Sequence, residues 1–545
     1  MRNSRPRLYP CTWRSNDINW KVKGIVVVTK TRKPNILLLM VDQMSALALS
    51  MHGNAISQTP NIDALAETGV VFDNAYCNSP LCAPSRFSML TGRLPESINA
   101  FDNASEFRAD IPTMAHYMSA LDYHTILCGK MHFIGPDQLH GYEERLTTDV
   151  YPASFAWMPN WDAGPKYISS GVNLSAVVEA GPCVRSLQMD FDDEVEYFGV
   201  QKLYDLARDD DEWPFFFTLS FTQPHSPYTP GQEFWDRYRH EDIDMPSVAE
   251  IPYDELDALS QGLYFAHGRD QHEVTKEHIR NTRHGYYGMM SCIDDKIGHV
   301  MRVLEETGLR ENTIVVFTSD HGEMLGERGM WYKHCFFEWA ARVPLIISDP
   351  GNITPHREEK IVSHVDLLPT LLDLASDGDH GDKPTDIDGA SLIGLLSGGV
   401  ADWSETAISD YLAIGPCVPC RMIRMGRYKL HYIHGHDPLL FDMETDPEEL
   451  NDLADEPAFS DIRNQLESKL MENYDPDDLD KRVRESQRRR FLIADATKRR
   501  AMWDYVARPG DESRYVRNAQ ADDTKGRQRF PFVEPAPLKA PGAVS

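Results

Sequence analysis

The chain has 545 residues, of which 84 are acidic and 55 are basic, so its formal net charge is −29. A hydrophobic share of 41% and a charged share of 26% are ordinary for a globular protein and exclude disordered and fibrous classes. The negative charge argues against nucleic acid or an anionic membrane as a partner, because phosphate groups attract basic surfaces. Nine cysteines over this length do not form the dense pattern of a secreted disulfide framework.

The first 33 residues differ from the rest, because they contain nine basic residues and a single acidic one. Their only apolar run, residues 24–28, is shorter than the roughly 7–15 residues of a signal-peptide core. No stretch of the sequence approaches the roughly 20 apolar residues that span a bilayer. We therefore expect residues 1–33 to be an unstructured basic extension of a cytoplasmic protein that has no membrane partner.

From residue 34 onward, short apolar runs repeatedly end at a polar group. Four runs show this pattern: residues 36–41 before Asp42, 125–127 before Lys130 and His132, 215–221 before His225, and 313–318 before Asp320 and His321. Such β-rich runs, separated by helical stretches such as 59–68 and 281–307, are typical of a helix-covered parallel sheet. Ligands of such sheets bind beyond the carboxyl ends of the strands. The sequence thus predicts an α/β fold with its active site at that edge.

The pattern also predicts three regions after the basic extension. We expect the catalytic α/β domain to span residues 34–400, with one more strand at residues 343–347. Residues 401–475 are predicted to form a smaller α+β subdomain with a small antiparallel sheet, followed by a helix over 446–453. Residues 476–545 are expected to form a helical tail that contacts the substrate pocket and other subunits of a homo-oligomer.

One short segment carries most of the chemical information: Leu-Cys-Ala-Pro-Ser-Arg at residues 81–86, followed by Leu-Thr-Gly-Arg at residues 90–93. Pro84 suits the first turn of a helix, so Cys82 is expected at a helix N-terminus, where free N–H groups favour an anion. By itself, this placement fits either a nucleophilic cysteine or a buried structural thiol.

The Cys-x-Pro-Ser-Arg and Leu-Thr-Gly-Arg segments together resemble the signature of the type I sulfatases, which belong to the alkaline phosphatase superfamily. The resemblance implies an alkaline phosphatase-like sheet, and it implies that a maturation enzyme oxidises Cys82 to formylglycine. In that family, one hydroxyl of the hydrated aldehyde attacks sulfur, and the other then expels sulfate. Residues 128–149, 503–505 and 515–518 are similar to the choline-sulfatase branch of the family.

The same resemblance implies one divalent cation, bound by Asp42, Cys82, Asp320 and His321. It implies Ca²⁺, while a donor set of oxygens and one histidine also admits Mg²⁺ or Mn²⁺. Many sulfatases carry an aspartate where this chain has Gln43 and an asparagine where it has His321. These differences leave the identity of the metal open.

Five side chains receive catalytic roles from the resemblance. Lys130 and His132 match the family pair beside the formylglycine, with His132 as the base. His225 and Lys333 match the pair on the leaving-group side, where a poor alkoxide leaving group needs a general acid. Arg86 is expected to hold the hydrated formylglycine.

The substrate-binding residues are expected to suit a trimethylammonium group, which has no hydrogen to donate. Aromatic faces and carboxylates bind such cations. From their positions in the resemblance, the candidates are Asn103, for a sulfate oxygen, and Trp157, Asp410, Trp503 and Asp504, for the alcohol. For each of the last four, an ordinary core tryptophan or surface acid explains the residue equally well.

The resemblance therefore implies an enzyme that cleaves a small-molecule sulfate ester, choline-O-sulfate, to choline and inorganic sulfate. A phosphonate monoester or phosphodiester hydrolase of the same superfamily remains an alternative, because that group shares the strand end at Asp42 and the motif at Cys82. The complete catalytic set disfavours a non-hydrolytic phosphomutase-like or binding protein. Cys417 and Cys420 have metal or redox spacing but no second pair, so we expect an incidental, reduced pair.

Overall fold

The computed structural model describes residues 33–167, 172–209, 213–376, 384, 386–399, 403–498, 529–531 and 533–534. The predicted basic extension, apart from residue 33, and most of the tail after residue 498 lie outside the described residues. Among the helices that are described, none is long and apolar enough to cross a membrane.

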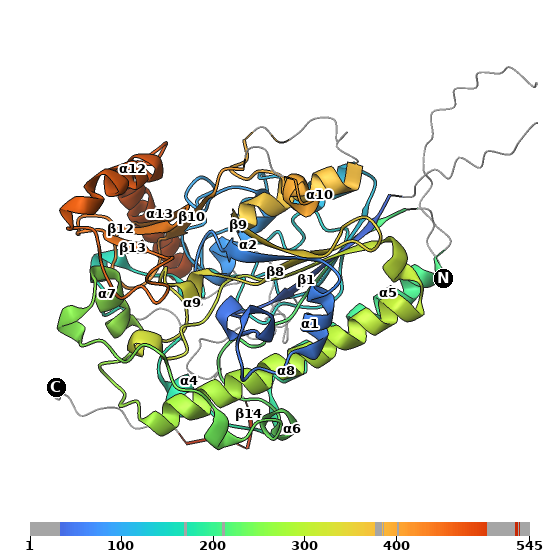
Figure 1. Cartoon of the computed structure of the whole chain (residues 1–545), viewed down its shortest axis with the longest axis horizontal. Helices are drawn as coiled ribbons and strands as arrows, with labels where there is room; N and C mark the ends of the chain where they lie inside the picture. Colours follow the sequence, from blue (N-terminus) through green and yellow to red (C-terminus); the bar gives the residue numbers. More distant parts are fainter. Residues whose placement is uncertain are drawn as a thin grey trace, which may run out of the picture. The chain divides into compact units, whose positions relative to one another are not determined.

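An eight-stranded sheet lies at the centre of the fold (Figure 1). In spatial order its strands are β4 (Glu144–Arg145), β3 (His124–Gly129), β6 (Phe215–Ser220), β1 (Asn35–Val41), β7 (Thr313–Ser319), β8 (Leu345–Ser348), β2 (Val70–Tyr76) and β9 (His356–Ser363). Every neighbouring pair is parallel except the two pairs that β8 makes with β7 and β2. The predicted helix-covered, mostly parallel sheet is therefore confirmed.

Both faces of this sheet are buried, because the central strand β1 has apolar side chains on each side. Leu37 and Leu39 belong to one hydrophobic core, whereas Leu38 and Met40 belong to a second core on the opposite face. The first core includes α1 (Pro60–Ala66), α5 (Leu187–Arg208) and α8 (Lys276–Glu306), and the second includes α2 (Cys82–Thr91), α3 (Met114–Ala120) and α10 (Leu367–Ser376). The predicted helices over 59–68 and 281–307 correspond to α1 and α8.

Shorter helices lie in the connections between these elements. They are α4 (Ser175–Val178), α6 (Gln232–Trp235), α7 (Ala258–Ala266), α9 (Glu338–Ala341) and α11 (Ile393–Leu396). Strand β5 (Arg185–Ser186) pairs with β14 (Arg529–Phe530) in a two-stranded sheet. Residues 529–530 of the C-terminal tail therefore lie against the catalytic region.

A second, antiparallel sheet follows the large one in the chain. Its strands are β10 (Thr406–Tyr411), β11 (Cys420–Met425), β12 (Tyr428–Ile433) and β13 (Leu439–Asp442), in that order. Helices α12 (Ser460–Leu470) and α13 (Pro476–Thr497) pack on it and share its hydrophobic core (Figure 1). The predicted small antiparallel sheet is present.

The predicted helix over residues 446–453 is wrong, because this segment forms turns. The Asp446 carboxylate accepts the N–H of Asn451 at 2.7 Å, a local bond that competes with helix formation. Glu449 has a left-handed φ of 56°, and its carboxylate lies 2.9 Å from Lys429 Nζ in the neighbouring strand. The side chains that make the segment acidic are thus engaged in turn and ion-pair contacts.

Candidate active site

The carboxyl ends of four parallel strands bring polar side chains to one edge of the large sheet. Asp42 directly follows β1, Lys130 follows β3 and Asp320 follows β7, while His225 lies five residues after β6. All four side chains are at most 3% exposed. This is the edge at which sheets of this kind bind ligands.

Cys82 is the first residue of α2, a helix whose ten residues are all buried. Pro84 occupies the first turn, as the motif predicts. Asn103 Oδ1 accepts the N–H of Ala83 at 2.9 Å and so satisfies one of the free donors at the helix N-terminus. Cys82 Sγ lies 3.2 Å from His321 Nε2, so the thiol faces the predicted metal ligands.

Arg86 lies one helical turn after Cys82 and joins the carboxylates that follow β1 and β7. Its Nε donates to Asp320 Oδ2 at 2.8 Å, and its Nη2 lies 3.5 Å from Asp42 Oδ2. Lys130 Nζ forms an ion pair with the same Asp42 oxygen. Burial alone would raise the pKa of Asp320, but the charges of Arg86 and Lys130 hold this pKa below its ordinary value.

The predicted metal ligands form one compact cluster. Donor atoms of Asp42, Cys82, Asp320 and His321 all lie within 4.8 Å of one another, and all four residues are buried. Burial, above all, lowers the pKa of His321 to about 3, so its imidazole is neutral, the form that binds metals. Two carboxylates and an imidazole fit Ca²⁺, Mg²⁺ or Mn²⁺, and an oxygen at position 82 would suit these hard ions better than sulfur.

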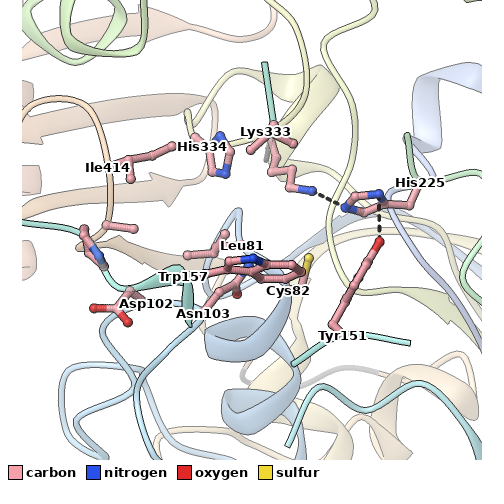
Figure 2. Close-up of a pocket in the computed structure, with 13 residues that line it drawn as sticks. Leu81, Cys82, Asp102, Asn103, Tyr151, Trp157, His225, Lys333, His334 and Ile414 are labelled. Atoms are coloured by element: carbon pink, nitrogen blue, oxygen red, sulfur yellow. Dashed lines mark hydrogen bonds between the residues drawn. The ribbon is translucent and has the colours of Figure 1, made fainter. Parts of the chain in front are cut away.

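A second group of polar side chains faces Cys82 from the other side of the site (Figure 2). Lys333 Nζ lies 2.7 Å from His225 Nε2 and donates to Gln43 Oε1. Because an ammonium group only donates, His225 Nε2 accepts and its Nδ1 carries the proton. That Nδ1 lies 2.7 Å from the carbonyl oxygen of Ser226 and 3.1 Å from the Tyr151 hydroxyl. The position of the imidazole is thereby fixed from both sides.

A buried carboxylate, Glu323, lies behind this pair and was not predicted from the sequence. It accepts hydrogen bonds from Gln43 Nε2, from the Tyr228 hydroxyl at 2.8 Å and from the N–H of Tyr332 at 2.6 Å. Glu323 thus accepts from the amide nitrogen of Gln43. The amide oxygen of Gln43 must then face Lys333.

The pocket in front of these groups spans about 450 Å³, part of which is open to solvent, and it reaches Cys82. Of the predicted residues, Asn103, Trp157, His225 and Lys333 also line it. The rest of the lining consists of five apolar residues and three polar ones: Leu81, Pro159, Val172, Ala413 and Ile414, and Asp102, Tyr151 and His334. Figure 2 shows the Trp157 ring beside Cys82, between Asn103 and the Lys333–His225 pair.

His132 lies next to this pocket rather than in its lining. Its ring centre is 5.3 Å from that of Tyr151 and 5.4 Å from that of Trp157. Its backbone has a left-handed φ of 60°, and its N–H donates to the Asp149 carboxylate at 2.8 Å. This uncommon backbone conformation is held by the surrounding contacts, as often occurs at functional sites.

The structure does not bring every predicted substrate contact to the pocket. Asp410, on β10, does not line it, and both of its carboxylate oxygens bond to Arg421, at 2.6 and 3.0 Å. Its carboxylate is paired within the protein, so its role as a substrate contact stays a prediction that the lining of this pocket does not support. Trp503 and Asp504 lie outside the described residues.

Fold and site together are typical of an α/β enzyme that binds an anionic substrate and a metal ion at the carboxyl edge of its sheet. Residues 34–377 match the sulfatase family model, and residues 326–475 match the model described as N-sulphoglucosamine sulphohydrolase, C-terminal. The chain therefore belongs to the sulfatase family, whose members hydrolyse sulfate esters.

Individual relatives are similar over most of the chain. A choline-sulfatase of Rhizobium meliloti (strain 1021) is 40% identical over 521 residues, which cover 92% of this chain and 100% of the relative. An arylsulfatase of Clostridium perfringens is 30% identical over 443 residues, covering 77% of this chain and 90% of the relative. The solved phosphonate monoester hydrolase of Agrobacterium radiobacter has a TM-score of 0.65 and 25% identity, covering 81% of this chain and 95% of that chain.

Proposed function

We propose that this sulfatase hydrolyses choline-O-sulfate to choline and inorganic sulfate. The observation that carries the proposal is the pocket over Cys82, in which Trp157 and apolar side chains lie close to Lys333 and His225. A trimethylammonium group donates no hydrogen bond and binds aromatic faces. The 40% identity to a choline-sulfatase over that protein's full length supports the same substrate.

The proposal includes two groups that the chain would acquire. A maturation enzyme would oxidise Cys82 to formylglycine, and Asp42, Asp320, His321 and the modified residue 82 would hold Ca²⁺, or else Mg²⁺ or Mn²⁺. When bound, these two groups supply an oxygen nucleophile and positive charge beside the sulfate. The remaining chemistry comes from the side chains of this chain.

On the sulfate side, we assign Arg86 and Lys130 to charge neutralisation. Both cations are fully buried, and a buried cation attracts an anion more strongly than an exposed one does. Arg86 is fixed by Asp320 and by the carbonyl oxygen of Lys130, at 2.8 and 2.6 Å, so it is already oriented before a substrate binds. We assign His132 as the base that accepts a proton at a ring nitrogen on this side of the site.

On the alcohol side, we assign Lys333 and His225 to the leaving group. Lys333 Nζ would donate its proton to the departing oxygen, which is needed because an aliphatic alkoxide leaves poorly. His225 Nε2, 2.7 Å from Nζ, accepts from the ammonium group and holds its direction. Gln43, oriented by Glu323, holds the same ammonium group from a second side.

A second candidate function is the hydrolysis of phosphonate monoesters or phosphodiesters. The observation that favours it is the likeness to a solved phosphonate monoester hydrolase over 81% of this chain. The site chemistry is compatible with either substrate, because both are tetrahedral anionic esters that need a nucleophile, buried cations and a protonated leaving group.

The two functions are separated by comparing kcat/KM for choline-O-sulfate and for phenyl phosphonate esters on the full-length, matured enzyme. We expect a clear preference for choline-O-sulfate, measured as release of inorganic sulfate. Cys82→Ala serves as the control for background hydrolysis. A higher kcat/KM for the phosphonate ester would overturn the proposed substrate, and binding of either ester without turnover would support a non-hydrolytic protein.

A further inference from the structure

Helix α13 (Pro476–Thr497) lies beyond both family-model matches, which end at residues 377 and 475. On the basis of the function proposed above, we propose that two side chains of this helix, Gln487 and Arg490, are positioning residues for the alcohol-binding pocket. They are three residues apart, so they lie on the same helix face. Both are buried, with 2% and 5% of their surface exposed. Each makes a polar contact with a different segment of the pocket wall.

Arg490 fixes the segment that carries Asn103. Its Nη1 and Nη2 donate to the two carboxylate oxygens of Asp102, at 2.6 and 2.7 Å. Asp102 itself lines the pocket, and the next residue, Asn103, accepts the N–H of Ala83 at the start of α2. A two-point guanidinium–carboxylate pair defines both position and direction. Arg490 therefore sets where Asn103 and the start of the Cys82 helix meet the substrate.

Gln487 fixes two other wall segments through Trp161. Its Oε1 accepts the N–H of Trp161 at 2.9 Å, and the Trp161 indole Nε1 donates to the carbonyl oxygen of Ala413 at 2.6 Å. Ala413 lines the pocket, as does Trp157, four residues before Trp161. Gln487 thus holds Trp161, and Trp161 in turn joins the segment that supplies the aromatic wall to the segment that follows β10.

These contacts form on different sides of the pocket. Figure 2 shows Asp102 and Asn103 below the Trp157 ring and Ile414, the neighbour of Ala413, above it. None of the contacts touches the predicted metal ligands or the Lys333–His225 pair. Loss of Gln487 should therefore change the fit of the alcohol more than the chemistry at sulfur, whereas loss of Arg490 should also disturb Asn103, which is expected to hold a sulfate oxygen.

The test uses the full-length, matured enzyme with two esters, choline-O-sulfate and 4-nitrophenyl sulfate. Variants are Arg490→Gln, Asp102→Asn, the double variant of this pair, and Gln487→Met. Arg489→Ala is the matched control, because this arginine is 65% exposed and pairs within the helix with Glu485. Thermal unfolding is recorded for every variant, so that loss of fold is separated from loss of fit.

We expect Gln487→Met to raise KM for choline-O-sulfate on the order of 10- to 100-fold, with KM and kcat for 4-nitrophenyl sulfate within about threefold of wild type. Arg490→Gln should raise KM for choline-O-sulfate by a similar factor and should also raise KM for 4-nitrophenyl sulfate, because it acts through Asn103. The double variant should recover part of the Arg490→Gln loss, because it leaves no unpaired carboxylate behind. If Arg490→Gln does not fold, Arg490→Lys replaces it. This variant retains the charge but not the two-point contact, so an intermediate rise in KM is expected.

Two results would overturn this assignment. One is an unchanged KM for choline-O-sulfate in both variants alongside a lower melting temperature, which would make the contacts merely structural. The other is an equal loss on both esters in Gln487→Met. Failure of the proposed function is recognised separately, because the wild-type enzyme would then not cleave choline-O-sulfate. In that case the KM values of the variants would be compared for the ester that the wild type does cleave.

Discussion

Replacing Lys333 by methionine tests the assignment of the leaving-group side. Methionine has a similar length but no donor, so His225 Nε2 and Gln43 Oε1 would each lose the partner they have in the structure. General acids contribute about 10²- to 10⁴-fold to a rate. At 1.36 kcal/mol per factor of ten, this corresponds to about 3–5 kcal/mol of transition-state stabilisation. We expect this full loss in kcat/KM for choline-O-sulfate, because choline leaves as a poor alkoxide.

The informative quantity is the difference between two substrates. Nitrophenolate leaves without protonation, so kcat/KM for 4-nitrophenyl sulfate should fall by less than about tenfold in the same variant. Lys202→Met is a matched control, since Lys202 lies on α5 and pairs with Glu144 at 2.6 Å, outside the site. Equal losses on the two esters would refute the reasoning, because Lys333 would then act on the sulfate group rather than on the leaving oxygen.

Three further predictions follow from other parts of the structure. Cys82→Ala should retain the wild-type melting temperature yet release no sulfate; wild-type turnover would refute the nucleophile assignment. Lys429→Met should lower the free energy of unfolding, measured in urea, by about 3–5 kcal/mol. The reason is that the buried carboxylates of Glu338 and Glu449, which lie 2.8 and 2.9 Å from Lys429 Nζ, would lose this cationic partner. An unchanged free energy of unfolding would contradict this prediction. Burial, aided by nearby cations, lowers the pKa of His267 in the folded protein to about 3. The folded protein therefore holds the imidazole in its neutral form, whereas the unfolded chain takes up a proton near pH 6.5, so the free energy of unfolding decreases as the pH falls below about 6.5. Between pH 7 and pH 5, His267 should cost the wild type about 2 kcal/mol of unfolding free energy. The His267→Gln variant should not show this part of the loss.

The sequence was sufficient for the large sheet and for the edge that carries the site. Residues 36–41, and residues 314–317 within the run 313–318, are apolar at every position, which is typical of a strand covered on both faces. The polar residues that follow them, Asp42 and Asp320, then have to meet at the carboxyl edge. The start of α2 was likewise predictable, because Pro84 restricts where that helix can begin.

The contacts that complete the pocket could not be predicted in this way. Asp102 and Arg490 are 388 residues apart, so nothing local in the sequence connects them. Asp410 is a predicted substrate contact, but the fold pairs both of its oxygens with its cross-strand neighbour Arg421, which the sequence alone does not indicate. Glu323 follows the Asp320–His321 pair closely in the chain, but its role depends on which donors the fold gathers around it. Such pairings depend on tertiary packing rather than on periodicity.

The central claim is that residue 82 is the reacting group of a sulfatase, and mass spectrometry of the peptide that contains it tests this claim most directly. The full chain would be coexpressed with a formylglycine-generating enzyme, digested and analysed. We predict that the peptide is lighter than its cysteine form by the difference between a thiol and an aldehyde side chain, and that this fraction rises in step with sulfate release. A fully active enzyme whose Cys82 peptide retains the unmodified thiol would contradict the account.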